Sequence, residues 1–196
     1  DKLELFAKKH IDGHAPGIRG KEVQAYRLAG VENDHECSTA EEVLDKLRAG
    51  LHIYVREGSG AKNLETLIKT MLDAGVCLDR CAFCTDDKHV EEIRKEGHIS
   101  TCIRKAIALG VPVAKAYKMG SYQAAEFYGL KNYGAIGAGY RADIVFLDDL
   151  EQVRPLDVMK DGRILTEEDY AKDYSVPVPD ELLHTVHVGE VTKEKI

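Results

Sequence analysis

The feature that most constrains the fold is a strand–turn–helix order that recurs along residues 8–129. Each unit joins a short apolar or β-branched stretch to a polar turn and then to a segment with apolar residues at helical spacing. Expected strands lie at 8–14, 31–36, 51–59 and 80–87, and expected helices at 21–30, 38–50, 61–75, 99–110 and 113–129. Because strands and helices alternate, we predict parallel strands connected by crossover helices.

Helix boundaries are marked by residues typical of helix ends. Ser38 or Thr39 can cap the helix expected at 38–50, and Gly50 can end it. Between the strand expected at 80–87 and the helix that begins at Ile99, the sequence predicts a polar loop.

Two folds are consistent with this order. A complete (β/α)8 barrel takes about 250 residues, so four strand–helix units correspond to half of one barrel. The alternative is a small open α/β sheet, and periodicity alone does not separate the two.

The pattern changes after residue 132. Residues 134–165 show no helical period, and strands are expected at 142–148 and 153–162, with a hairpin signal at Asp161–Gly162. We therefore expect three regions: residues 1–132 with the strand–helix units, 133–175 as a small β domain segment, and 176–196 as a linker and the start of a further region. The stretch SVPVPDE, at 175–181, is expected to be extended.

Charge and cysteine usage narrow the class of protein. A formal net charge of −7 argues against a general binder of nucleic acid or membrane surfaces, both of which attract basic proteins. No apolar run approaches the roughly 20 residues of a membrane helix, and the first ten residues lack the apolar core of a signal peptide. The 5 cysteines do not follow a secreted-domain spacing, so we expect reduced thiols and a cytoplasmic protein.

Every expected strand ends in polar side chains, with ionisable groups among them. They are Asp12 and His14, then Asp34, His35 and Glu36, then Arg56, Glu57 and Ser59, and finally Thr85, Asp86 and Asp87. In parallel α/β folds the strand ends carry the chemistry, and two imidazoles with a carboxylate suit Zn, Mn or Fe. The alternative is that each histidine is a hydrogen-bonded structural residue and that Asp86 caps the segment that follows it.

Three other motifs are rejected. HECST has threonine where the second histidine of a zinc helix belongs, and GAGYRA precedes a strand instead of a helix. Cys81 and Cys84 would point to opposite faces of a strand, and no second cysteine pair accompanies them.

Several longer stretches together resemble bacterial adenine deaminases, which belong to the metal-dependent amidohydrolase superfamily. They are DGHAPGIRGKEVQAYRLAGVENDHECSTAEEVLDKLRAG, VREGSGAKNLETL, FCTDDKH and GHISTCIRKAIALGV, in this order. GAIGAGYRADIVFLDDLE resembles the return of the superfamily's chain from its barrel into a small β domain. The resemblance implies an α/β fold: strands five to eight of a (β/α)8 barrel, with their helices, and part of the small β domain.

The same resemblance assigns roles to individual residues. His14, His35 and Asp86 are similar to the metal ligands that end the fifth, sixth and eighth strands. It implies Asp86 as the proton shuttle and Glu36 as a second catalytic residue. Arg56, Glu57, Ser59 and Lys62 match a loop expected to bind substrate.

The implied reaction is hydrolytic deamination of adenine to hypoxanthine and ammonia. A divalent cation, Mn or Fe with Zn as the alternative, lowers the pKa of a bound water so that hydroxide forms near neutral pH. His14 and His35 bind metal only when neutral, so activity is expected to fall in acid. Adenine is the expected partner, without nucleic acid or membrane, and the full-length protein is expected to be a homo-oligomer.

Two parts of the family's metal site have no counterpart in this sequence. The H-x-H pair of the first strand is absent, and so is the bridging carboxylate of the fourth. We therefore expect a middle-to-late fragment of a longer enzyme. Two alternatives stay open: a related enzyme acting on another cyclic amidine or amide, or a non-catalytic chain that lacks half of its ligands and associates through exposed strand edges.

Overall fold

The computed structural model describes residues 2–6, 8–172, 175–187, 189 and 192. The chain forms two compact units, Asp1–Ile164 and Leu165–Ile196. The first unit holds both sheets and every predicted site residue. The division into 1–132, 133–175 and 176–196 stays a prediction.

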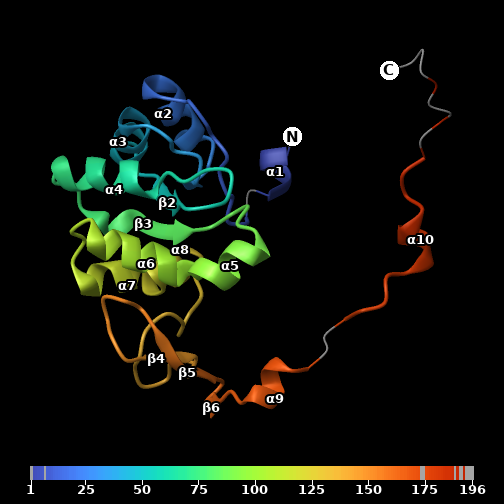
Figure 1. Cartoon of the computed structure of the whole chain (residues 1–196). Coiled ribbons are helices and arrows are strands. Elements are labelled where there is room, and N and C mark those ends of the chain that lie inside the picture. Colours follow the sequence, from blue (N-terminus) through green and yellow to red (C-terminus); the bar gives the residue numbers. More distant parts are fainter. Residues whose placement is uncertain (1, 7, 173–174, 188, 190–191, 193–196) are drawn as a thin grey trace. The chain divides into compact units, whose positions relative to one another are not determined.

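A parallel sheet forms the centre of the first unit, as predicted (Figure 1). Its strands lie in the order β1 (Asn33–Asp34), β2 (His52–Arg56) and β3 (Cys81–Cys84). Asn33 is in register with His52, and Ile53 with Cys81. Helix α2 (Gly20–Leu28) precedes β1, and the crossover segments contain α3 (Ala40–Arg48), α4 (Leu64–Asp73) and the short 3-10 helix η1 (Leu78–Arg80).

Helix α3 begins where the sequence predicted. Thr39 is the cap: its hydroxyl accepts from the amide of Glu42, and the Glu42 carboxylate accepts from the Thr39 amide. Gly50 follows the helix at φ 82°, a conformation that favours glycine.

The strand predicted at 8–14 is wrong, since residues 8–19 contain neither helix nor strand. Side chains of β1 bind this segment instead of a backbone ladder: the Gly13 amide donates to Asn33 Oδ1 at 2.6 Å and the Ala15 amide to Asp34 Oδ1 at 2.9 Å. Gly13 lies so close to β1 that an added Cβ would stand 1.9 Å from the Asn33 carbonyl oxygen.

The polar loop predicted after β3 is also wrong, because it contains α5 (Val90–Glu96). This helix buries no residue, so it lacks the apolar period by which the other helices were recognised. Acidic residues in its first turn and basic residues in its last turn complement the helix dipole.

Three further helices follow: α6 (Ile99–Ala108), α7 (Val113–Gly120) and α8 (Tyr122–Phe127). The single helix predicted at 113–129 is interrupted at Ser121, which has φ −144° and ψ −81°. The Ser121 hydroxyl donates to the Tyr117 carbonyl at 2.7 Å.

The main core joins the sheet to the crossover helices. Ile53 and Val55 of β2 alternate with residues on the other face of the strand, and both are fully buried. Leu67 and Ile68 of α4 belong to the same buried cluster. These buried side chains fix the sheet against the helices, and the polar side chains stand at the carboxyl ends of the strands.

An antiparallel sheet completes the first unit and confirms the predicted hairpin. It consists of β4 (Ile144–Leu147), β5 (Pro155–Lys160) and β6 (Arg163–Ile164), in that order. Asp161 and Gly162, between β5 and β6, have φ values of 51° and 79°, as a tight hairpin turn requires.

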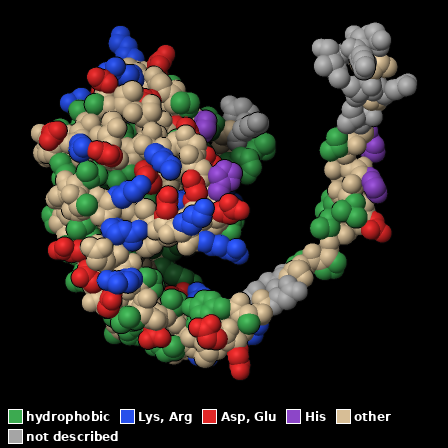
Figure 2. Space-filling model, in the orientation of Figure 1, with side chains coloured by type: hydrophobic (Ala, Val, Ile, Leu, Met, Phe, Trp, Pro, Cys, Tyr) green, Lys and Arg blue, Asp and Glu red, His purple; other side chains and the backbone are tan. Residues whose placement is uncertain are grey.

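Shorter helices lie toward both ends of the chain: α1 (Lys2–Phe6), α9 (Glu167–Tyr170) and α10 (Asp180–Leu183). Residues 175–179 are irregular, as expected of an extended segment, whereas α10 includes Asp180 and Glu181 of the same stretch. Among the described residues, no helix combines the length and apolar character needed to cross a membrane. Figure 2 shows acidic and basic side chains intermixed over the visible face of the first unit.

Candidate metal centre

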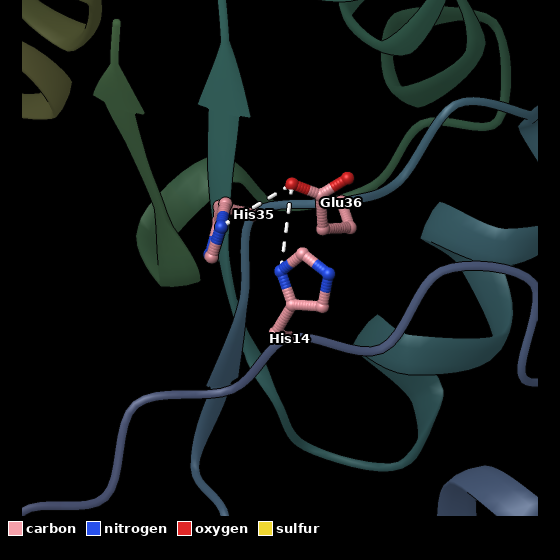
Figure 3. Close-up of side chains that lie close together, drawn as sticks. All are labelled: His14, His35 and Glu36. Carbon is pink, nitrogen blue, oxygen red and sulfur yellow. Dashed lines mark ion pairs between the residues drawn. The ribbon is translucent and has the colours of Figure 1, made fainter. Parts of the chain in front are cut away.

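Two histidines and a glutamate converge at the carboxyl end of β1 (Figure 3). His14 comes from the irregular segment before α2, while His35 and Glu36 directly follow β1. Glu36 Oε1 lies 3.7 Å from His14 Nδ1 and 3.3 Å from His35 Nε2. One donor atom from each residue lies within 4.8 Å of the other two.

This donor set fits a divalent metal ion. Imidazole nitrogen and carboxylate oxygen are the ligands that Zn, Mn and Fe share, and the measured spacing lets the three atoms face one cation. The His14 side chain is 69 % exposed, that of His35 28 % and that of Glu36 18 %. The centre is therefore open on the His14 side and supported on the Glu36 side.

Helix α2 helps to place His14. The Tyr26 hydroxyl of that helix accepts the His14 amide at 2.9 Å. This bond anchors the backbone of His14 and leaves its imidazole directed toward Glu36 (Figure 3).

Arg56 links the metal group to the loop after β3. Its Nη1 contacts Glu36 Oε1 and lies 2.8 Å from Asp86 Oδ2, and its Nη2 lies 3.2 Å from Asp87 Oδ1. Burial opposes the charge of Arg56, but the hydrogen bond that the guanidinium donates to Asp87, together with the three nearby carboxylates, outweighs burial and raises the pKa of the guanidinium. One cation thus holds three carboxylates together at the strand ends.

The structure places Asp86 differently from its predicted partners His14 and His35. Among the described residues, the convergent donor group consists of His14, His35 and Glu36, whereas Asp86 pairs with Arg56. Asp86 has a φ of 45°, a left-handed conformation that Asp tolerates better than most residues. Its role as a metal ligand stays a prediction.

The predicted substrate loop divides into two parts. Glu57 is buried, its Oε1 lies 2.6 Å from Lys105 Nζ, and its Oε2 accepts the Leu64 amide at the start of α4. Ser59 and Lys62 instead meet Glu92 of α5. Of the four predicted residues, Arg56 contacts the metal group through Glu36.

Lys46 was not singled out by the sequence reasoning, although its position contained a signal. It follows Val43 by three residues, so it lies on the buried side of α3. The side chain of Lys46 is fully buried and its Nζ lies 2.9 Å from Asp34 Oδ2. A lysine at an apolar helix position indicates a buried acidic partner.

Comparisons with known proteins identify the family of this chain. Residues 2–165 match the Amidohydrolase family. The whole chain is 40 % identical to an adenine deaminase of Desulfitobacterium hafniense and 42 % identical to one of Clostridium acetobutylicum. An adenine deaminase of Gluconobacter oxydans is 46 % identical over 85 % of the chain. The chain spans 34 %, 35 % and 29 % of these relatives, about a third of their length.

Two solved structures are similar to this chain in fold. A β-aspartyl dipeptidase of Fervidobacterium islandicum, crystallised with a β-Asp-Leu dipeptide, superposes with a TM-score of 0.64 at 18 % identity. The match covers 90 % of this chain and 55 % of that one. A second solved structure, of an amidohydrolase, gives a TM-score of 0.53 at 20 % identity, over 74 % of this chain and 42 % of the other.

Proposed function

Since the chain belongs to the amidohydrolase family, we propose that it forms part of an enzyme that hydrolyses adenine to hypoxanthine and ammonia. The observation that carries this proposal is the convergence of His14, His35 and Glu36 in a chain about 40 % identical to adenine deaminases over its whole length. Because the chain spans about a third of those relatives, the reaction is proposed for the longer protein.

We assign the parallel half of the first unit to strands five to eight of a (β/α)8 barrel. Strands β1, β2 and β3 would be the sixth, seventh and eighth, and residues 8–14 would occupy the place of the fifth. The parallel order β1-β2-β3 and the position of the polar side chains after each strand support this assignment. The antiparallel sheet would belong to the small β domain.

His14, His35 and Glu36 would hold a divalent cation, for which we favour Mn or Fe over Zn. When bound, such a cation lowers the pKa of water and supplies a nucleophile near neutral pH. We propose Asp86 as a further residue that would hold the cation; in the structure its carboxylate pairs with Arg56, whose Nη1 lies between the carboxylates of Glu36 and Asp86.

We assign the chain's own acid–base chemistry to Asp86, and to Glu36 the positioning of the two imidazoles. We assign to Asp86 the transfer of a proton from the attacking water to the amino group, which leaves as ammonia, while oxygen bonds to C6. Glu36 holds its carboxylate beside both imidazoles and keeps their orientation. Arg56 ends β2, Ser59 and Lys62 lie in the loop that follows it, and the three are proposed to contact adenine.

We also propose a cytoplasmic, homo-oligomeric enzyme. All 5 cysteines are free thiols in the structure, in agreement with a reducing compartment. Size-exclusion chromatography with light scattering measures the oligomeric state.

The proposal is tested in the longer protein that carries this chain, by following hypoxanthine formation and ammonia release from adenine. His14→Ala is expected to abolish turnover, and Asp86→Asn to lower kcat by about 10²–10⁴. His89→Ala is the matched control, because His89 is exposed near the same strand ends but lies outside the convergent group.

Substantial turnover by His14→Ala or Asp86→Asn would contradict the assigned site. If the wild-type protein deaminates no adenine but hydrolyses hydantoins or dihydropyrimidines, adenine is the wrong substrate and one of these cyclic amides takes its place. A longer protein inactive on all three, with and without added Mn, would support a non-catalytic chain.

A further inference from the structure

A second group of charged side chains lies beneath the metal centre, inside the protein. Lys46 and Asp34 have fully buried side chains, and the Glu42 side chain is 4 % exposed. Lys46 Nζ lies 2.9 Å from Asp34 Oδ2 and 3.8 Å from Glu42 Oε1. We call Asp34, Glu42 and Lys46 the buried triad.

The buried triad holds both backbone groups of the residue that follows His14. The Ala15 amide donates to Asp34 Oδ1 at 2.9 Å, and the Ala15 carbonyl accepts from Lys46 Nζ at 2.6 Å. Ala15 is itself buried. Because both polar groups of one residue are bonded to an ion pair, the backbone carrying His14 is held in one orientation.

The same triad holds the segment that carries the other two ligands. Asp34 directly precedes His35, and its Oδ2 accepts the Glu36 amide at 3.1 Å. Glu42 Oε2 accepts the amides of Ser38 and Thr39 at 3.0 Å, and its Oε1 accepts the Gly17 amide at 2.5 Å. The segment that carries His14 and the segment that carries His35 and Glu36 are therefore both hydrogen-bonded to the buried triad.

Stability alone does not account for a buried ion pair at this place. Well-packed apolar residues of similar volume often stabilise a protein as well as a buried ion pair does, because both charges must be removed from water. What apolar residues cannot do is bond to the amide and carbonyl of Ala15 and to the amide of Glu36.

We propose that Lys46 and Asp34 are positioning residues that set His14 and Glu36 at the distance a divalent cation requires. This inference rests on the proposed function, since it concerns the same metal centre. Partners that orient metal ligands commonly change affinity by about 10–100-fold when they are removed.

The test uses Co²⁺ as the probe in the longer protein, with its affinity measured by visible absorption and the stability of the metal-free protein by thermal unfolding. Lys46→Met keeps most of the side-chain volume and is expected to weaken Co²⁺ binding at least tenfold and to lower Tm. The double variant Asp34→Leu/Lys46→Met leaves no charge at either position and no acceptor for the amides of Ala15 and Glu36, so Tm is expected to recover partly while affinity stays at least tenfold weaker.

Met71→Ala is the control for lost stability. Met71 is fully buried on α4 and its sulfur contacts Cys81 Sγ at 3.6 Å, away from both ligand segments. It is expected to lower Tm and to leave Co²⁺ affinity within about twofold of the wild type, because the cavity lies outside the residues that hold the ligands.

Hydrogen exchange of the metal-free proteins provides a second readout. Lys46→Met and the double variant are expected to speed exchange of the Ala15 amide, whereas Met71→Ala leaves it unchanged relative to global unfolding. Wild-type affinity in the double variant, or slow Ala15 exchange in it, would overturn the positioning role. Wild-type protein that binds no Co²⁺ would overturn the proposed metal site and, with it, the positioning of ligands.

Discussion

The buried triad and the metal centre use similar side chains under opposite conditions. In the triad, Lys46 and Asp34 are fully buried, and Asp34 accepts bonds from Ala15, Glu36 and Lys46. In the metal centre, His14 is 69 % exposed and contacts Glu36 through one ring nitrogen. The charged groups of the triad are held by hydrogen bonds within the protein. The metal centre has fewer such bonds, so its imidazole and carboxylate atoms can bind a ligand.

This difference distinguishes charged side chains that stabilise the fold from charged side chains that bind a ligand. Removing a member of the triad is expected to change the free energy of unfolding, because an unpaired buried charge remains. Removing a member of the metal centre is expected to change ligand binding, because a donor atom is lost. It is expected to change the free energy of unfolding little, because water can solvate the remaining groups. Four predictions test the contrast, beginning with the largest effect.

Lys46→Ala is expected to lower the free energy of unfolding by about 3–5 kcal/mol, since it leaves Asp34 buried without its cation. Urea unfolding of the 196-residue chain at pH 7 measures the loss. Lys69→Ala is the matched control: Lys69 pairs with Glu65 on the exposed surface of α4, and its loss is expected to cost less than about 0.5 kcal/mol. Equal losses in the two variants would contradict the contrast.

Glu42 is expected to make the stability depend on acid pH. Burial raises its pKa, but hydrogen bonds from Ser38 and Gly17 outweigh burial and lower the pKa from 4.5 to about 2. The carboxylate therefore contributes stability above about pH 4.5, on the order of 3 kcal/mol, and this contribution disappears as the pH falls toward 2.

Unfolding free energies of the wild type and Glu42→Gln between pH 7 and 2.5 check this dependence. The difference between the two proteins is expected to be constant near neutrality and to shrink below pH 4.5. A difference that does not change with pH would show that the ionised form of Glu42 is not the stabilising one.

Glu36→Gln is expected to weaken Co²⁺ binding in the longer protein at least tenfold, about 1.4 kcal/mol, and to change the free energy of unfolding by less than about 1 kcal/mol. Its carboxylate contacts both imidazoles yet remains partly exposed. Glu32→Gln serves as control, because Glu32 pairs with His10 and Arg27 outside the centre. A large loss of stability with unchanged affinity would assign Glu36 to the structural group.

Lys62→Met is expected to give the smallest change in stability, below about 0.5 kcal/mol, because Lys62 is half exposed and lies 3.8 Å from its partner Glu92. If Lys62 contacts adenine as proposed, KM rises several-fold while kcat is retained. Steady-state kinetics with Lys69→Met as the comparison measures this. An unchanged KM would remove Lys62 from the substrate site.

The local sequence pattern predicted an element correctly where the element has its own apolar periodicity and typical end residues. The apolar spacing and terminal residues of α3 and α4 predicted both helices, and the turn at Asp161–Gly162 predicted the hairpin between β5 and β6. It failed at residues 8–14, where side chains of Asn33 and Asp34 take the place of a strand partner. It failed again at α5, whose helix buries nothing and so has no apolar period.

The sequence by itself therefore determined that the strands are parallel, that a hairpin follows them and that ionisable groups stand at the strand ends. These features can be read from the succession of residues and elements along the chain. Only the tertiary structure decided which groups meet. It put Glu36, instead of Asp86, beside the two histidines, placed Asp86 against Arg56, and set Lys46 beneath the centre. Such pairings depend on the distances between separate elements, which short-range periodicity does not contain.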